Sequence, residues 1–88
     1  YSNKGEYDNA LEYYKKAREI MEKVLDPQHP DLAITYVNIA VTYRDKGEFD
    51  ICLEYLEKAL EIFEKSNHPY VQTVKTMIEQ TKARMEKQ

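Results

Sequence analysis

The fold is decided by residues 33–60, which read AITYVNIAVTYRDKGEFDICLEYLEKAL. On both sides of Gly47, apolar and small residues recur at steps of three and four, as on the buried face of a helix. Gly47 stands where this pattern breaks, at a bend that requires a positive φ. The stretch therefore predicts an antiparallel pair of helices over residues 30–46 and 50–66.

The chain also repeats itself with a period of 42 residues. When residues 1–23 are aligned with residues 43–65, 14 of the 23 positions are identical, which predicts a helix over residues 8–25 like that over 50–66. A weaker period of 39 residues pairs the His-Pro dipeptides at 29–30 and 68–69. It predicts a last helix over residues 69–87.

Particular residue types indicate where these helices begin. Asp8 and Asp50 are suitable N-caps, because a carboxylate accepts hydrogen bonds from the free amides of a first helical turn. Gly5 is expected to break the chain before Asp8, as Gly47 does before Asp50. The prolines at 30 and 69 are expected at the first helical position.

The hairpin resembles a tetratricopeptide repeat, through the motif Ala33…Tyr36-x-Asn38-Ile39-Ala40-x-x-Tyr43-x-x-x-Gly47-x-Phe49-Asp50-x-Cys52…Leu56-x-x-Ala59-Leu60. The 42-residue period and the His-Pro-Asp opener at 29–31 resemble the kinesin-light-chain variety. The resemblance covers nearly the whole chain and implies a protein-interaction scaffold without catalytic activity. The sequence departs from the family pattern at two places. Cys52 stands where members usually carry a small residue in the second helix of the pair, and the proline that usually ends that helix is absent.

The expected fold is therefore all-α, with antiparallel helix hairpins stacked as a short right-handed α-solenoid. Within a single domain over 1–88, residues 1–25 form a partial repeat, 30–66 the complete repeat and 69–87 a capping helix. Residues 1–4 correspond to the last turn of a first helix, so the solenoid reads as truncated at its N-terminal end. In the last helix, Glu79 and Lys82 replace Ala40 and Tyr43, and these polar residues suit a helix on which nothing further stacks.

Composition excludes several classes of protein. The net charge is -3 among 88 residues, which argues against a broad basic surface for nucleic acid. No apolar run approaches the roughly 20 residues that cross a bilayer. The single cysteine allows no internal disulfide and favours a reducing, cytoplasmic location.

No residue pattern points to a cofactor, a metal or an enzyme. His29 and His68 recur because the turn recurs, and we interpret them as helix-start residues. Cys52 lies on the apolar stripe at the position of Ala10 in the first repeat, which favours a buried, inert thiol. The eight tyrosines fall mostly on the core stripe, so packing explains them better than a ligand site does.

The resemblance implies that the first helix of each pair lines a concave groove for a peptide or protein segment. On residues 30–46 and 69–87, helical steps of 100° place nine residues on that face: Ile34, Val37, Asn38, Val41, Arg44, Thr73, Thr76, Gln80 and Arg84. Asn38 has a donor and an acceptor for a peptide backbone, and the two arginines favour an acidic segment. The alternative is that the aliphatic residues of this face pack on neighbouring helices.

A second functional hypothesis is structural self-association as a homo-oligomer. Without a preceding helix, Ala10, Tyr14 and Ala17 lose a packing partner at the N-terminal end. Each exposed apolar side chain forfeits roughly 1.5–3 kcal/mol, against about 4–13 kcal/mol for the whole fold. The sequence therefore predicts a dimer that covers this end or exchanges a helix.

Overall fold

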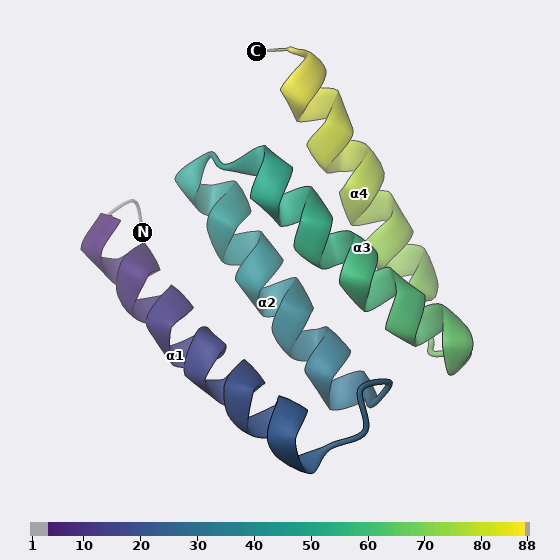
Figure 1. The fold of residues 1–88 in the computed structure, drawn as a ribbon. Coiled ribbons are helices and arrows are strands. Elements are labelled where there is room, and N and C mark those ends of the chain that lie inside the picture. The colour runs from purple at the N-terminus through teal and green to yellow at the C-terminus, as the bar shows by residue number, and fades with distance from the viewer. Residues whose placement is uncertain (1–3, 88) are drawn as a thin grey trace.

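The structure, a computed structural model, describes residues 4–87, and these fold into four helices (Figure 1). They are α1 (Lys4–Val24), α2 (Pro30–Lys46), α3 (Phe49–Lys65) and α4 (Val71–Glu86). Each helix packs on the next in the chain, and the most extensive contact joins α2 to α3. No strand lies within residues 4–87, and the expected all-α fold of consecutive helix hairpins is confirmed.

The core lies where α2, α3 and α4 meet. Ala33 and Ala40 of α2 are fully buried against Leu56 and Ala59 of α3, and these four side chains have no exposed area. Small residues at these positions let the two helix backbones approach closely, and Phe63 fills the space toward α4. The helical spacing of apolar residues around Gly47 therefore specifies the hairpin as expected.

The bends form as the sequence indicates at two of the three connections. Gly47 has φ 88°, its N–H donates to the carbonyl of Arg44, and the next N–H donates to that of Tyr43. At the start of α2, His29 Nδ1 accepts a hydrogen bond from the N–H of Asp31 at 3.0 Å. The interpretation of His29 as a helix-start residue is confirmed, whereas His68 Nδ1 accepts from the N–H of Tyr70 at 3.1 Å in the turn before α4 and does not cap that helix.

The predicted start of α1 is wrong. Gly5 and Asp8 lie inside α1, which begins at Lys4, because a glycine costs a helix only about 1 kcal/mol. Asp8 accepts a hydrogen bond from Lys46 Nζ at 2.9 Å and so joins α1 to α2 instead of capping a helix. Of the residues 1–4 that we expected to end a preceding helix, 1–3 lie outside the described residues.

Two other predicted helix starts are also wrong. The N-cap of α3 is Glu48, whose side chain makes no capping hydrogen bond, and Asp50 lies in the first turn. There its charge complements the positive end of the helix dipole. Pro69 and Tyr70 form a turn, and α4 begins only at Val71.

Candidate functional site

Two hollows flank α2 and meet on it. One, of about 260 Å³, lies between α2 and α4, and the other, of about 330 Å³, lies between α1 and α2. Ile34 and Asn38, one turn apart on α2, line both of them. We call the two hollows together the α2 groove.

The walls of the α2 groove are mainly apolar. Between α2 and α4 the lining residues are Ile34, Val37, Asn38, Tyr70, Thr73, Val74 and Met77. Between α1 and α2 they are Tyr13, Tyr14, Ala17, Met21, Asp31, Ile34, Thr35 and Asn38. Three of the polar lining residues, Asp31, Asn38 and Thr73, are exposed, and few polar groups among apolar walls are typical of a site that buries apolar side chains and orients them with few hydrogen bonds.

Tyr70 reaches the rim through the turn before α4. The ring of His68 lies 4.5 Å from that of Phe63 and 4.8 Å from that of Tyr70, and Phe63 and Tyr70 meet edge to face at 5.7 Å. Phe63 is fully buried, so this aromatic contact holds the turn against the core. Tyr70 remains half exposed beside the hollow.

The structure brings four of the nine predicted groove residues together. Ile34, Val37, Asn38 and Thr73 line the hollow between α2 and α4. The other five do not line either hollow: Val41, Arg44, Thr76, Gln80 and Arg84. Val41, Arg44, Gln80 and Arg84 lie further along α2 and α4 than the lining residues, whereas Thr76 lies between Thr73 and Met77 but is not part of the lining.

The two predicted arginines have partners of their own. Arg44 Nε lies 3.7 Å from a carboxylate oxygen of Asp45. The Arg84 guanidinium lies over the ring of Phe49, 4.9 Å from its centre, in a cation–π contact. An acidic segment would therefore compete with these contacts.

The repeat pattern also matches a known family over most of the chain. Residues 1–65 and, overlapping them, residues 31–79 match the family model described as Tetratricopeptide repeat. The chain belongs to the tetratricopeptide repeat family. Members of this family are in general protein-interaction modules, and the kinesin-light-chain-like variety is compatible with the match. Comparison with curated proteins gave no match.

In this tetratricopeptide module α1 also lines the α2 groove, which the sequence did not lead us to expect. Tyr13, Tyr14, Ala17 and Met21 line the hollow against α2, whereas only the helices equivalent to α2 and α4 were expected to line a groove. Tyr70 and Met77 were missed as well. One feature of the sequence could have indicated the α1 wall of the groove: the apolar residues of α1 occupy more of its circumference than one neighbouring helix can cover.

Of the tyrosines expected to pack in the core, Tyr36, Tyr43 and Tyr55 do so, whereas Tyr13, Tyr14 and Tyr70 line the α2 groove. The ring of Tyr55 lies 5.9 Å from Tyr36 and 6.1 Å from Tyr43, and its hydroxyl accepts a hydrogen bond from Arg18 Nη1 at 3.0 Å. The Tyr36 hydroxyl donates to Glu22 at 3.2 Å. Burial and the Glu22 carboxylate raise the pKa of Tyr36.

Cys52 occupies the interior of the module, where α3 packs on α4. It is about 1% exposed, and its Sγ lies 3.9 Å from the hydroxyl oxygen of Thr81. Burial raises the pKa of the thiol, although the contact with Thr81 opposes this. The expectation of a buried cysteine is confirmed, and the raised pKa disfavours the reactive thiolate.

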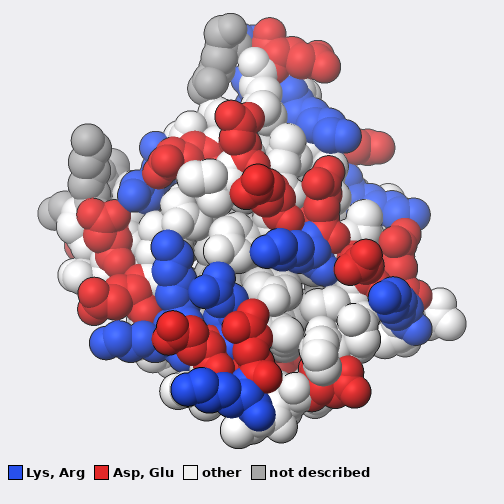
Figure 2. Space-filling model, viewed as in Figure 1, with Lys and Arg blue, Asp and Glu red and all other residues white. Residues whose placement is uncertain are grey.

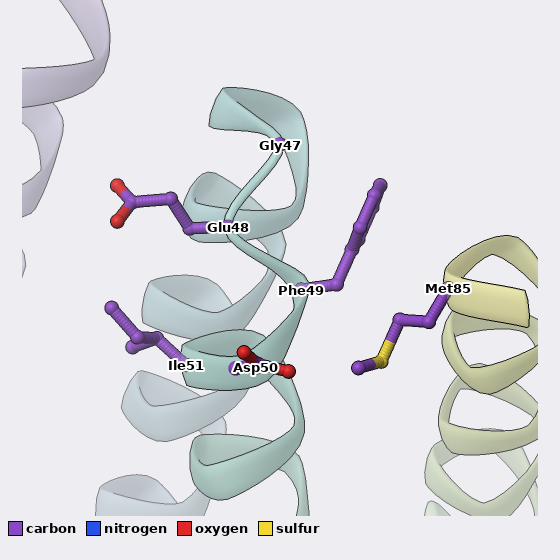
Figure 3. A pocket seen from close by; sticks show the side chains of 6 residues that line it. All are labelled: Gly47, Glu48, Phe49, Asp50, Ile51 and Met85. Carbon is purple, nitrogen blue, oxygen red and sulfur yellow. The ribbon is translucent and has the colours of Figure 1, made fainter. Parts of the chain in front are cut away.

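A third hollow, of about 360 Å³, lies between the α2–α3 bend and the end of α4 (Figure 3). Figure 3 shows Phe49 and Met85 projecting toward each other, while Glu48 and Ile51 project to the other side of the chain. The side chains that line this third hollow do not converge on one point. We therefore take the α2 groove as the candidate site, although this hollow is larger than either hollow of the groove taken singly.

Charge and metal-ligand chemistry single out no further site. Figure 2 shows acidic and basic side chains interspersed over the face in view. Among residues 4–87, no three His, Cys, Asp or Glu side chains gather so as to hold a metal ion. Within the same part of the chain, every helix is too short or too polar to cross a bilayer.

Proposed function

We propose that this tetratricopeptide module binds an extended segment of a partner protein in the α2 groove. The single observation that carries the proposal is the pair of apolar hollows that meet at Ile34 and Asn38. A segment crossing α2 would place one apolar side chain in each hollow. The two volumes, about 260 and 330 Å³, suit large aliphatic or aromatic side chains.

Asn38 supplies the polar contact in this proposal. Its side chain is exposed on α2 between the two hollows, and an amide donates to and accepts from an extended peptide backbone. Thr73 adds a hydroxyl from the α4 side. Arg44 and Arg84 favour an acidic residue beyond the hollow, after their contacts with Asp45 and Phe49 are exchanged.

Peptides selected against the wild-type chain from a displayed random library test this proposal. Val37→Asp places a carboxylate in the hollow between α2 and α4 and should weaken their binding by about 30-fold or more. Thr73→Arg, at an exposed position of the same hollow, should weaken it without disturbing the core. Gln72→Asp is the matched control, because Gln72 is exposed and lines neither hollow.

The proposal is wrong if the selected peptides bind Val37→Asp and Thr73→Arg as tightly as the wild type while far-UV circular dichroism shows all proteins folded. Loss of binding in the Gln72→Asp control would instead show that an added charge weakens binding wherever it lies, and would also refute the proposed site.

Self-association is a second candidate function, favoured by the outward side of α1. Tyr13, Ile20 and Val24 are 70%, 62% and 71% exposed there, although the three residues named from the sequence, Ala10, Tyr14 and Ala17, are half-buried against α2. Light scattering over a concentration series tests this candidate. A monomer at all concentrations would refute it.

We further propose a non-catalytic role in a reducing, cytoplasmic compartment, with no cofactor. Cys52, the only cysteine, is unpaired and buried, as suits a chain that forms no internal disulfide. The tetratricopeptide repeat family is in general not enzymatic. A mass measurement under oxidising conditions checks the thiol, which should stay free in the folded protein.

A further inference from the structure

The side of α2 that points away from the α2 groove carries a second surface, on which basic side chains surround tyrosine rings. At 100° per residue, Tyr36 and Tyr43 lie roughly 140–180° around α2 from Ile34 and Asn38. The helices α1 and α3, which pack on either side of α2 (Figure 1), complete this surface. We call it the basic tyrosine surface, and its members are Lys15, Arg18, Tyr36, Tyr43, Tyr55 and Lys58.

The tyrosine rings form the floor of the basic tyrosine surface. Tyr43 and Tyr55 are stacked within 10° of parallel with 6.1 Å between their centres, and the Tyr36 ring lies 5.9 Å from that of Tyr55. Arg18 reaches from α1 toward α3, where its Nη1 donates a hydrogen bond to the Tyr55 hydroxyl at 3.0 Å. All three tyrosines are half-buried, so packing on three helices holds the rings in place.

Basic side chains stand over this floor from both flanking helices. Lys15 Nζ of α1 lies 5.5 Å from the centre of the Tyr43 ring, and Lys58 Nζ of α3 lies 5.3 Å from that of Tyr55. Arg18 follows Lys15 by one helical turn on α1. The cation–π contacts hold the ammonium groups over the rings. Because neighbouring positive charges repel one another, an anion placed among them is stabilised.

Much of the bonding capacity of these groups is unused within residues 4–87. Lys15 and Lys58 form no ion pair with any residue of that range. Arg18 donates to Tyr55, but its Nε has no hydrogen-bond acceptor there. The Tyr55 hydroxyl accepts from Arg18 and donates to none of the described residues. The basic tyrosine surface therefore presents positive charge and hydrogen-bond donors without matching acceptors.

We propose that the basic tyrosine surface binds the side-chain oxyanions of a short acidic segment of a partner protein. Carboxylate and phosphoryl oxygens accept charge-assisted hydrogen bonds from ammonium and guanidinium groups, and the Tyr55 hydroxyl can donate to the same anion. Lys15 and Lys58 lie beside rings whose centres are 6.1 Å apart. In an extended segment, side chains two residues apart point to the same side and are roughly 6.6 Å apart, so anions at alternate positions can reach both lysines.

Carboxylates at both ends of the surface favour a short segment over a long polyanion. At the end near the α2–α3 bend, Asp8 and Glu48 pair with Lys46 at 2.9 and 3.5 Å. At the other end, Glu22 accepts a hydrogen bond from the Tyr36 hydroxyl. A nucleic-acid strand that followed the surface would meet these carboxylates, whereas a segment with a few anionic residues fits between them. The net charge of -3 also disfavours a nucleic acid.

This site is separate from the surfaces discussed above. The α2 groove lies on the opposite side of α2, so the failure of one site would leave the other untouched. On α1, Lys15 and Arg18 lie roughly 100–160° around the helix from Ala17, on a different side from the exposed apolar residues. The three helices that form the site lie within the described residues.

Titration of the ¹⁵N-labelled chain, followed by amide chemical shifts at about 25 mM salt, tests the proposal. Three peptides share a glycine-serine backbone and carry glutamate, phosphoserine or glutamine at two alternate positions, and a short oligothymidylate is the fourth probe. The glutamate and phosphoserine peptides should shift the amides near Lys15, Arg18 and Lys58, with dissociation constants of about 0.1–1 mM. The glutamine peptide should shift none of them, and about 0.3 M salt should weaken the binding several-fold.

Two double variants locate the binding. Lys15→Gln/Lys58→Gln should raise the dissociation constants of both anionic peptides by about 5-fold or more. Lys65→Gln/Lys82→Gln is the matched control, because it changes the net charge equally at exposed sites on α3 and α4, and it should bind like the wild type. Glutamine is a good helix former, so circular dichroism should show unchanged helix content in both.

A third variant tests the sign of the electrostatics. Glu22→Gln should strengthen binding by about 2-fold or more, because it removes a carboxylate from the border while its amide oxygen can still accept from the Tyr36 hydroxyl. Weaker or unchanged binding in this variant would contradict the proposed charge attraction.

The probes separate the sources of the anion. Whichever of the glutamate and phosphoserine peptides binds more tightly supports the proposal and identifies the oxyanion. The proposal is overturned if neither shifts these amides, if the glutamine peptide binds as tightly, or if the two double variants have equal effects. An oligothymidylate that binds more tightly than both peptides also overturns it, since the ligand would then be a nucleic acid.

Discussion

Ile62 and Ile20 occupy equivalent positions of the 42-residue repeat, but only Ile62 is buried, and alanine at the two positions should therefore have very different costs. Ile62 is 4% exposed in the core between α2 and α3. Truncating such a side chain to alanine lowers the free energy of unfolding by about 2–5 kcal/mol. Ile20 is 62% exposed, so its truncation should cost roughly 0.5–1 kcal/mol.

Urea unfolding at about 5 µM protein, followed by far-UV circular dichroism, measures both costs. For a domain of this length, with a total stability of about 4–13 kcal/mol, Ile62→Ala should shift the midpoint strongly or abolish the folded state. Equal costs at the two positions would show that α1 is covered in solution to the same extent as α3. A cost under about 1 kcal/mol for Ile62→Ala would refute the packing of α3 described above.

The bends and the titrating groups give three further predictions. Gly47→Ala should lower the free energy of unfolding by about 1 kcal/mol. The cost comes from its φ of 88°, since no atom lies within 4 Å of an added Cβ. Gly5→Ala, inside α1, should be neutral or stabilising by up to about 1 kcal/mol, and thermal unfolding of both variants checks this. His29→Ala should cost about 1 kcal/mol and His29→Asn much less, since Asn also caps a helix; a similar loss in both would contradict the capping role. Because folding raises the pKa values of Cys52 and Tyr36 above their ordinary 9.0 and 10.0, the protonated forms favour the folded state, and the free energy of unfolding should fall as the pH rises above about 9. Urea midpoints between pH 7 and pH 10.5 measure this, and an unchanged midpoint would argue against burial of both groups.

Much of the fold could be predicted from particular residues. The apolar spacing around Gly47 predicted α2, α3 and the bend between them, because that spacing matches the helical period and only glycine readily adopts the required positive φ. The 42-residue repeat then predicted α1 by equivalence. The starts of α1, α3 and α4 could not be predicted well, because Asp8 forms an ion pair with Lys46 of another helix and Asp50 does not accept capping hydrogen bonds.

The candidate site was predictable on the α2 side and, on α4, only at Thr73. Helical steps of 100° placed Ile34, Val37 and Asn38 on one face. How far the hollows extend along α2 depends on where α1 and α4 cross it. For this reason Tyr70 and Tyr13 were missed, and Arg84 was expected in a groove although its guanidinium lies over Phe49.

The sequence by itself determined the helices, their repeat and the family, because helical period and bend chemistry are local properties of the chain. Only the tertiary structure decided which of two nearly identical faces is buried. Ile20 and Ile62, like Tyr13 and Tyr55, are the same residues at the same repeat positions, yet α2 covers Ile62 and Tyr55, while Ile20 and Tyr13 stay exposed among residues 4–87. Burial depends on which neighbour is present in space, and a repeated sequence does not contain that information.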